Sequence, residues 1–182
     1  MSRALIFAGL LAMLPVASAM AAKPIEYEDA DLQLRFYPRT PDQMSAFYEG
    51  RGFPPAMIAL LRDYCFITVS LRNKGADVLW LDLAEWRFSD ASGAVERIAR
   101  SVWPPRWAAM AVPLASQSTF RWTLLPEVLD FQPDEREGGN VILVPPPGRF
   151  SLSARFVRGA DRRGRVVQVR VDGLYCARDQ AP

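Results

Sequence analysis

The chain of 182 residues contains no histidine and only two cysteines, which limits the chemistry that its side chains can perform. Without histidine, no Ser-His-Asp or Cys-His nucleophile can form, and no histidine-ligated zinc, copper or haem site. The cysteines, Cys65 and Cys176, lie too far apart for a Cys-x-x-Cys redox motif. Glycine-rich phosphate-binding motifs are missing as well. We therefore expect neither a cofactor nor a metal, and a protein that is not an enzyme.

Carboxylates are the remaining candidates for catalysis. A glycosidase requires two of them at a fixed separation across a cleft, and a calcium site requires several converging oxygens. The acids between residues 127 and 137 do not match an EF-hand loop, and we interpret them as solvated charges. A carboxylate-dependent hydrolase is the alternative that would use such residues. The candidates are Asp82, Glu85, Glu127, Asp130, Asp134, Glu135 and Glu137.

Tryptophan and arginine residues in a proline-rich stretch form the candidate binding surface. Its members are Trp103, Arg106, Trp107, Arg97 and Arg100. Exposed tryptophan beside arginine is typical of the hot spots of protein interfaces, and a flat indole ring can also stack on a sugar. The competing interpretation is that both tryptophans are buried and that the arginines stack on them. The surface therefore predicts a protein partner or a glycan, or else a purely structural role.

A second basic group surrounds the loop that begins at Gly159. Arg158, Arg162, Arg163 and Arg165 lie close to a single acid, Asp161. Such a loop could contact phosphate or an acidic surface. We interpret it as the solvated tip of a hairpin.

These residues must be positioned by the strands that the hydrophobic pattern predicts. Residues 64–73 alternate between apolar and polar side chains with a period of two, which predicts a central strand with one face in the core. An Asn-Lys-Gly turn then predicts that residues 78–83 return as its hairpin partner. Residues 127–137 are expected to be a linker and residues 138–140 a tight turn. Further strands are predicted over residues 32–36, 86–88, 94–99, 118–125, 141–144, 150–156 and 165–171.

One of these strands carries two aromatic residues. In the strand expected at 118–125, Phe120 and Trp122 would share one face, so both should pack in the core. Residues 100–117 fit no regular element, because two prolines prevent a central strand there.

A pair of short helices is predicted at residues 41–63. Thr40, Pro41 and Gln43 have the spacing of a capping box with proline at the first helical position. Gly50 and Gly52 end the first helix, and Pro54-Pro55 begins the second. We expect this insertion to cover an edge of a sheet.

The succession of elements also resembles a known class of protein. A strand, an Asn-Lys-Gly turn, an apolar strand, an Asp-Ala-Ser-Gly turn and a later Phe-Arg-Trp-Thr-Leu-Leu-Pro strand resemble bacterial extracytoplasmic immunoglobulin-like modules, over roughly residues 64–176. The resemblance implies a mainly β protein: an immunoglobulin-like antiparallel β-sandwich with a short helical-hairpin insertion near the N-terminus. It implies no functional residue. Residues 23–182 would form a single domain.

Residues 1–22 have the features of a cleaved signal peptide. Arg3 precedes an apolar run at residues 4–14, and Ala17-Ser18-Ala19 offers a cleavage site. The run is shorter than the roughly 20 residues that span a bilayer, and no cysteine marks a lipid attachment point. No later stretch is long enough to span. The sequence therefore predicts a periplasmic or secreted protein without stable membrane insertion.

Compartment and charge restrict the partners further. In an oxidising compartment, Cys65 and Cys176 are expected to form a disulfide.

Removal of residues 1–22 leaves 21 basic and 20 acidic residues. This near balance gives no electrostatic reason to expect binding to nucleic acid or to an anionic membrane.

Together these features favour a non-catalytic binding or accessory protein of an envelope assembly that acts through protein–protein contacts. A carbohydrate-binding module that uses the same tryptophan and arginine surface is the second hypothesis. A structural stabiliser without a separate ligand is the third.

Overall fold

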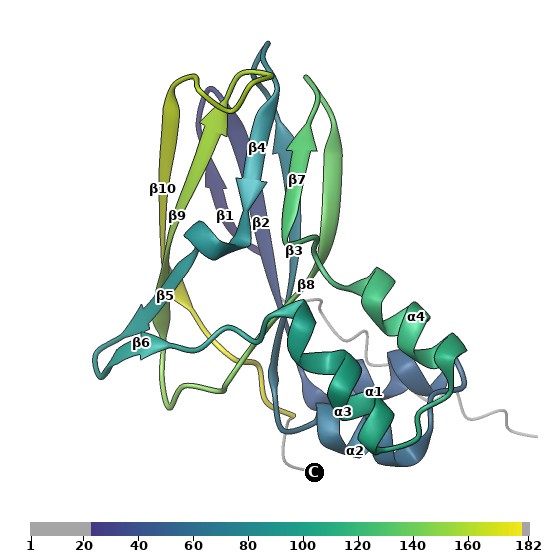
Figure 1. Cartoon of the computed structure of the whole chain (residues 1–182). Coiled ribbons are helices and arrows are strands. Elements are labelled where there is room, and N and C mark those ends of the chain that lie inside the picture. The colour runs from purple at the N-terminus through teal and green to yellow at the C-terminus, as the bar shows by residue number, and fades with distance from the viewer. Residues whose placement is uncertain (1–22, 180–182) are drawn as a thin grey trace, which may run out of the picture.

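The computed structural model describes residues 23–179, which form two antiparallel β-sheets and a few helices (Figure 1). The strands occupy one end of the molecule, and the four α-helices gather at the other end. The signal peptide expected at residues 1–22 lies outside the described residues. The mainly β prediction is confirmed.

The first sheet is built around the predicted central strand. Strand β3 (Cys65–Asn73) pairs with β2 (Leu32–Arg39) on one side and with β8 (Arg136–Leu143) on the other, and β1 (Ile25–Glu28) extends the sheet beyond β2. The period of two in β3 has the expected effect, because Cys65, Ile67, Val69 and Leu71 are all buried in the core.

The second sheet contains the remaining strands. Strand β9 pairs with β10 along one edge and with β4 and β5 along the other, while β7 pairs with β4 and β6 with β5. The predicted terminal hairpin is confirmed as β9 and β10. The strands are β4 (Leu79–Asp82), β5 (Arg87–Asp90), β6 (Gly93–Val95), β7 (Val128–Phe131), β9 (Phe150–Arg158) and β10 (Val166–Leu174).

The predicted hairpin of residues 64–73 and 78–83 is wrong, because β4 pairs with β7 and β9 in the second sheet. The side chain of Asn73, which is fully buried, donates hydrogen bonds to the carbonyls of Asp77, Phe131 and Gln132. These bonds turn the chain away from β3 and carry it across to the opposite sheet. There Leu79 and Leu81 enter the shared core.

The two sheets pack against one common core, and the expected disulfide joins them at one end. Buried residues of β2, β3 and β8 contact those of β4, β5, β9 and β10 in a single hydrophobic cluster. Cys65 at the start of β3 is bonded to Cys176, which follows β10, with a Cα–Cα distance of 5.4 Å. The disulfide prediction is confirmed.

A second hydrophobic core lies between the helices and the outer face of the first sheet. Phe66 of β3 and Ile142 of β8 do not belong to the first core but to a second hydrophobic cluster, which includes buried residues of all four α-helices. The helices therefore cover a face of the sheet and not an edge of it. They are α1 (Pro41–Glu49), α2 (Pro55–Leu61), α3 (Trp103–Ala109) and α4 (Leu114–Thr123), and 3-10 turns lie at Leu83–Glu85 and Arg100–Val102.

The predicted helix pair is confirmed as α1 and α2. Thr40 caps α1: its hydroxyl accepts from the Gln43 amide at 3.2 Å, and the Gln43 side chain accepts from the Thr40 amide at 3.1 Å. The second pair, α3 and α4, occupies the stretch that fitted no regular element and most of the strand predicted at 118–125. That strand prediction is wrong.

The linker predicted at 127–137 and the turn at 138–140 are also wrong, because these residues form β7 and most of β8. The two glycines in β8 permit a close approach of backbones. A Cβ atom on Gly139 would lie 2.4 Å from the Leu125 nitrogen, and one on Gly138 would lie 2.9 Å from the Val69 carbonyl oxygen. Glycine here serves packing between neighbouring segments and does not form a turn.

Removal of the disulfide should lower the free energy of unfolding. The bond closes a loop with a sequence separation of 111 residues, and the chain-entropy model assigns about 4–5 kcal/mol to a loop of that size. Urea denaturation of the oxidised protein should be compared with that of the Cys65→Ser/Cys176→Ser variant. A loss of less than about 1 kcal/mol would contradict this role for the bond.

Candidate functional site

The tryptophans of the candidate binding surface are core residues. Trp103 and Trp107 are each 1% exposed, because they lie four residues apart on the inner face of α3. Their rings stack with centroids 5.2 Å apart, and Phe120 of α4 packs edge-on against both. Neither ring is available as an exposed platform for a partner or a sugar.

The arginines of that surface are engaged within the protein. Arg106 donates to the Tyr64 hydroxyl and lies over the Trp103 ring, 5.5 Å from its centroid. Arg97 forms two hydrogen bonds to Glu127, at 3.0 and 2.8 Å. Both arginines therefore make contacts within the protein, and of the two only Arg106 lies over a tryptophan of the candidate surface.

Arg100 has a structural contact of a different kind. It donates to the carbonyl oxygens of Arg121, at 3.1 Å, and of Leu124, so it satisfies the C-terminal end of α4. Burial, together with the neighbouring Arg121, lowers the pKa of the Arg100 guanidinium, although Glu127 opposes this shift. Two positive charges therefore lie close together beside α4.

A groove runs beside α4 with these arginines at its rim. It has a volume of about 870 Å³, within the range of roughly 300–1,000 Å³ that is usual for ligand pockets. Most of its lining is apolar, including Pro104, Leu114, Leu124 and Val128. Its charged lining residues are Arg100, Arg121 and Glu127, and Glu127 is already paired with Arg97.

The outer face of α4 exposes large hydrophobic side chains that sequence reasoning missed. Leu114 is 80% exposed and Trp122 is 83% exposed, and Val128, at the start of the next strand, is 46% exposed. Elsewhere in residues 23–179 the only comparable side chain is Val144. The expectation that Trp122 packs beside Phe120 is wrong, because in a helix residues two apart point in nearly opposite directions.

The sequence does contain a hydrophobic pattern that indicates a helix in the region of α4. Ser116, Phe120 and Thr123 recur at intervals of four and three residues, and they form the inner face of α4. Pro113 precedes the helix and Pro126 follows it. The β-rich composition of residues 118–125 concealed this signal.

A smaller hollow lies on the other side of α4, above the outer face of β3 and β8. It has a volume of about 470 Å³, and its lining is more polar than that of the groove. Trp122, Arg39, Gln43, Thr68 and Asn140 contribute to it. The helix α4 therefore separates the apolar groove from a hollow whose lining is more polar.

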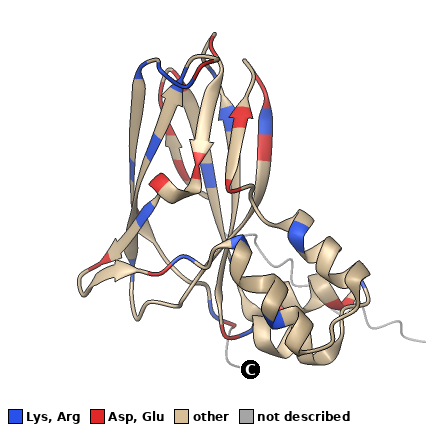
Figure 2. Cartoon of the chain, in the orientation of Figure 1, with Lys and Arg blue, Asp and Glu red and all other residues tan. Residues whose placement is uncertain are grey.

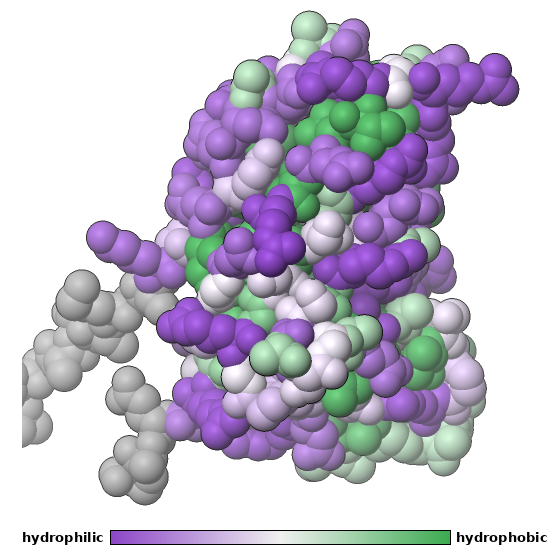
Figure 3. Space-filling model, turned by 90° about the vertical axis from the view of Figure 1, so that its left-hand side faces the viewer, coloured by the Kyte–Doolittle hydropathy of each residue, from purple (hydrophilic) through white to green (hydrophobic). Residues whose placement is uncertain are grey.

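Charge is distributed unevenly over the molecule. Most charged residues lie on the strands and their connections, where both signs alternate, and the helices carry few (Figure 2). The side formed by β5, β6 and β10 is mostly hydrophilic, with hydrophobic areas between the hydrophilic side chains (Figure 3). The exposed leucine and tryptophan of α4 thus lie in the part of the molecule that carries the fewest charges.

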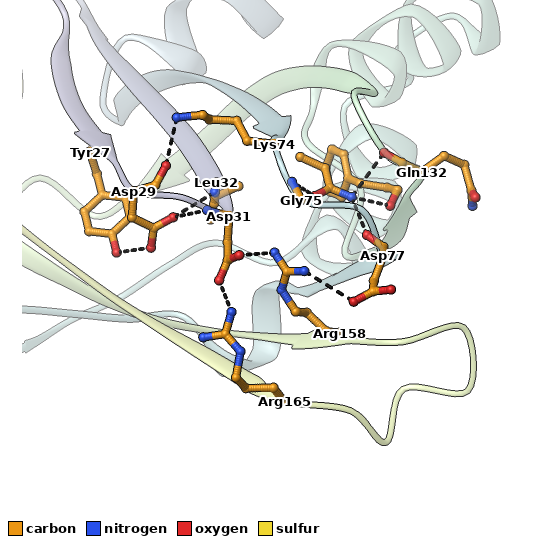
Figure 4. A network of polar contacts seen from close by, with 12 residues as sticks. Tyr27, Asp29, Asp31, Leu32, Lys74, Gly75, Asp77, Gln132, Arg158 and Arg165 are labelled. Carbon is orange, nitrogen blue, oxygen red and sulfur yellow. Dashed lines mark hydrogen bonds and ion pairs between the residues drawn. The ribbon is translucent and has the colours of Figure 1, made fainter.

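The arginines of the β9–β10 loop meet carboxylates (Figure 4). Arg158 and Arg165 both donate to Asp31, and Arg158 also contacts Asp77 at 3.4 Å. Arg162 reaches Asp82 at 3.4 Å. These three arginines are already paired, which removes most of the positive charge that a phosphate would need.

The carboxylates considered for catalysis do not form a metal cluster. Within residues 23–179, no group of three or more acids and cysteines is arranged to hold a metal ion. Glu127 pairs with Arg97 and Asp134 with Arg72.

Within residues 23–179, no helix is both long and apolar enough to cross a membrane.

Comparisons with known proteins place the chain in no family. No family model matches it, and no curated protein matches it. Among solved structures, the putative lipoprotein ycdA of Bacillus subtilis matches 84% of this chain with a TM-score of 0.42 and 14% identity. The yjhA protein of the same organism matches 71% of the chain with a TM-score of 0.39 and 11% identity.

The two matches differ in how much of the other protein they include. This chain spans 39% of the ycdA chain and 76% of the yjhA chain. At these TM-scores the similarity supports no inference about the fold or activity of this protein.

Replacement of Asp31 by alanine should lower the free energy of unfolding by about 3 kcal/mol. It would leave the Arg158 side chain, which is 10% exposed, with Asp77 as its one remaining carboxylate. Asp77→Ala is the matched control, because Asp77 is 65% exposed and its loss should cost less than about 1 kcal/mol. Equal losses for the two variants, measured by urea denaturation, would contradict this assignment.

Proposed function

We propose that this protein is a non-catalytic accessory protein of an envelope assembly, with an immunoglobulin-like fold, that binds a protein partner in the groove beside α4. The observation that carries the proposal is the apolar groove with Leu114 exposed at its border. A mostly apolar groove with a few polar groups at its rim is the usual form of a binding site. The absence of histidine from the sequence supports a role without catalysis.

The charges of the groove indicate the chemistry of the partner. Arg100 and Arg121 lie at the rim without a carboxylate partner among residues 23–179, since the nearby Glu127 is paired with Arg97. A segment that inserts apolar side chains and places a carboxylate near Arg121 would complement both features. The expected occupant is therefore an apolar and acidic segment of another protein.

The expected location agrees with this role. A disulfide between the two sheets is typical of proteins in oxidising compartments, and residues 1–22 have the pattern of a signal peptide. We propose that the mature chain is periplasmic or secreted and meets its partner there.

Affinity capture with groove variants tests the proposal. The full chain with a C-terminal tag is expressed in its own host and isolated from gently solubilised envelope. The Leu114→Ser and Arg121→Gln variants should each recover the partner at least ten-fold less efficiently, a loss of about 1.4 kcal/mol or more in binding. Recovery with the wild-type chain should also decrease as the salt concentration rises, because the carboxylate contact is screened.

Two variants serve as controls for this experiment. Val144→Ser removes an exposed apolar side chain far from the groove in sequence, and Trp122→Ala removes one from the other side of α4. Both should recover the partner as well as the wild type does. Undiminished recovery with Leu114→Ser and Arg121→Gln would refute the groove as the binding site.

A further inference from the structure

We infer a second binding site, for an acidic saccharide, in the hollow between Trp122 and the outer face of β3 and β8. The site goes beyond the proposed function, because it lies on the other side of α4 from the groove. Its elements are an exposed aromatic ring, a cation and polar side chains held in fixed positions. Each of these elements can be assigned a role toward a sugar.

Trp122 provides the apolar surface. Its side chain is 83% exposed and borders the hollow, so the flat ring is available for stacking. Planar ligands such as nucleic acid bases stack favourably on aromatic side chains that are exposed in this way. One face of a sugar ring consists of C–H groups and suits such a surface.

Arg39 provides the positive charge. Its Nε atom donates to the Thr68 hydroxyl at 3.0 Å, and its two terminal nitrogens have no acceptor among residues 23–179. No carboxylate in that part of the chain lies within ion-pair distance of it. This contrasts with the arginines of the β9–β10 loop, which are paired. The guanidinium also lies over the Tyr37 ring, 5.5 Å from its centroid, and these contacts leave its terminal donors for a carboxylate ligand.

Polar side chains complete the lining, and their positions are fixed. Asn140 is 8% exposed and accepts from the Thr68 hydroxyl at 2.8 Å. Thr68 in turn accepts from Arg39, so the three side chains form one chain of hydrogen bonds. Gln43 is held through its carbonyl oxygen, which accepts from the Thr40 amide, and its NH₂ group has no acceptor within the described part of the protein. The terminal nitrogens of Arg39 and the NH₂ group of Gln43 are therefore free to donate to the acceptors of a ligand, in place of solvent.

These donors and the ring together favour a saccharide over an acidic peptide. A uronic acid or a similar unit carries a carboxylate for Arg39, hydroxyl oxygens for Gln43 and a C–H face for Trp122 within one ring. An acidic peptide would need side chains at several positions to supply the same three groups, whereas the saccharide unit carries them on one ring. The hollow, at about 470 Å³, falls within the usual size of ligand pockets.

Binding to defined oligosaccharides tests the inference. A panel of immobilised glycans that contains several uronic acid oligomers and their methyl esters is probed with the full chain, and hits are titrated by tryptophan fluorescence. At least one acidic oligosaccharide should bind and shift the emission, and its methyl ester should bind at least ten-fold more weakly. Trp122→Ala should weaken binding at least ten-fold, and Trp122→Phe by less, because an aromatic ring remains.

Two further variants test the role of the Arg39 charge and whether binding occurs at the hollow and not at the groove. Arg39→Gln should abolish the preference for the acid over its methyl ester while the ester still binds. Leu114→Ala, on the same helix but at the groove, should leave saccharide binding unchanged. Because Trp122 is largely exposed, Trp122→Ala should unfold at the same urea concentration as the wild type, which separates a binding defect from a folding defect.

The outcomes that would overturn the inference are distinct. If no acidic glycan of the panel binds, or if Trp122→Ala binds as well as the wild type, the site is not a saccharide site. If hexaglutamate peptide binds at the hollow and the glycans do not, the site belongs to an acidic protein segment. None of these outcomes would affect the proposal that a protein partner binds in the groove, because that proposal is tested with Leu114→Ser and Arg121→Gln.

Discussion

The structure depends on the burial of strand β3 on both of its faces at its first residues. Cys65 and Ile67 face the core between the two sheets, and Phe66 between them faces the helices. A strand whose two faces are apolar must be covered on both sides. The second sheet provides one cover and the four α-helices provide the other, and farther along β3 the outer residues Thr68, Ser70 and Arg72 become more exposed. The helical layer therefore ends where the apolar outer face ends.

This boundary explains the position of the polar hollow. Phe66 and its neighbour Ile142 on β8 are covered by helices, whereas Thr68 and Asn140, two residues farther on, line the hollow together with Trp122 and Thr123 of the last turn of α4. The change from apolar to polar side chains on one sheet face thus forms the floor of a hollow under the edge of the helical layer. The groove arises differently, because it runs along α4 between α3 and the start of β7, with Leu114 near one end and Val128 near the other. Two binding surfaces with different chemistry result from one layer of helices.

The sequence predicts the parts of this fold that depend on local patterns. The alternation in β3, the capping box of α1, the terminal hairpin and the disulfide each leave a signal within a few residues or in the residue type itself. The pairing of β4 was missed because it depends on buried hydrogen bonds of Asn73 to residues some 60 positions away. The helix α4 was missed because Phe120, Trp122 and Leu124 also alternate as in a strand, and the packing of Phe120 against Trp103 and Trp107 decides between the two patterns. Both candidate binding surfaces depend on α4, so neither could be derived correctly without it.

The two ends of α4 differ in how firmly they are held, and this bears on what each can bind. At the C-terminal end, Thr123 bonds to the buried Tyr48 at 2.9 Å, Arg100 contacts the last carbonyls, and the Leu125 amide donates to Asn140 at 3.1 Å. At the N-terminal end no side chain caps the helix, and Ala111 adopts the left-handed region with φ of 51°, which is costly for a residue other than glycine. A rigid end suits a small ligand, whose binding cannot compensate for much lost conformational entropy. A less constrained end with exposed Leu114 suits a protein partner, whose larger interface can compensate for the ordering of a few residues.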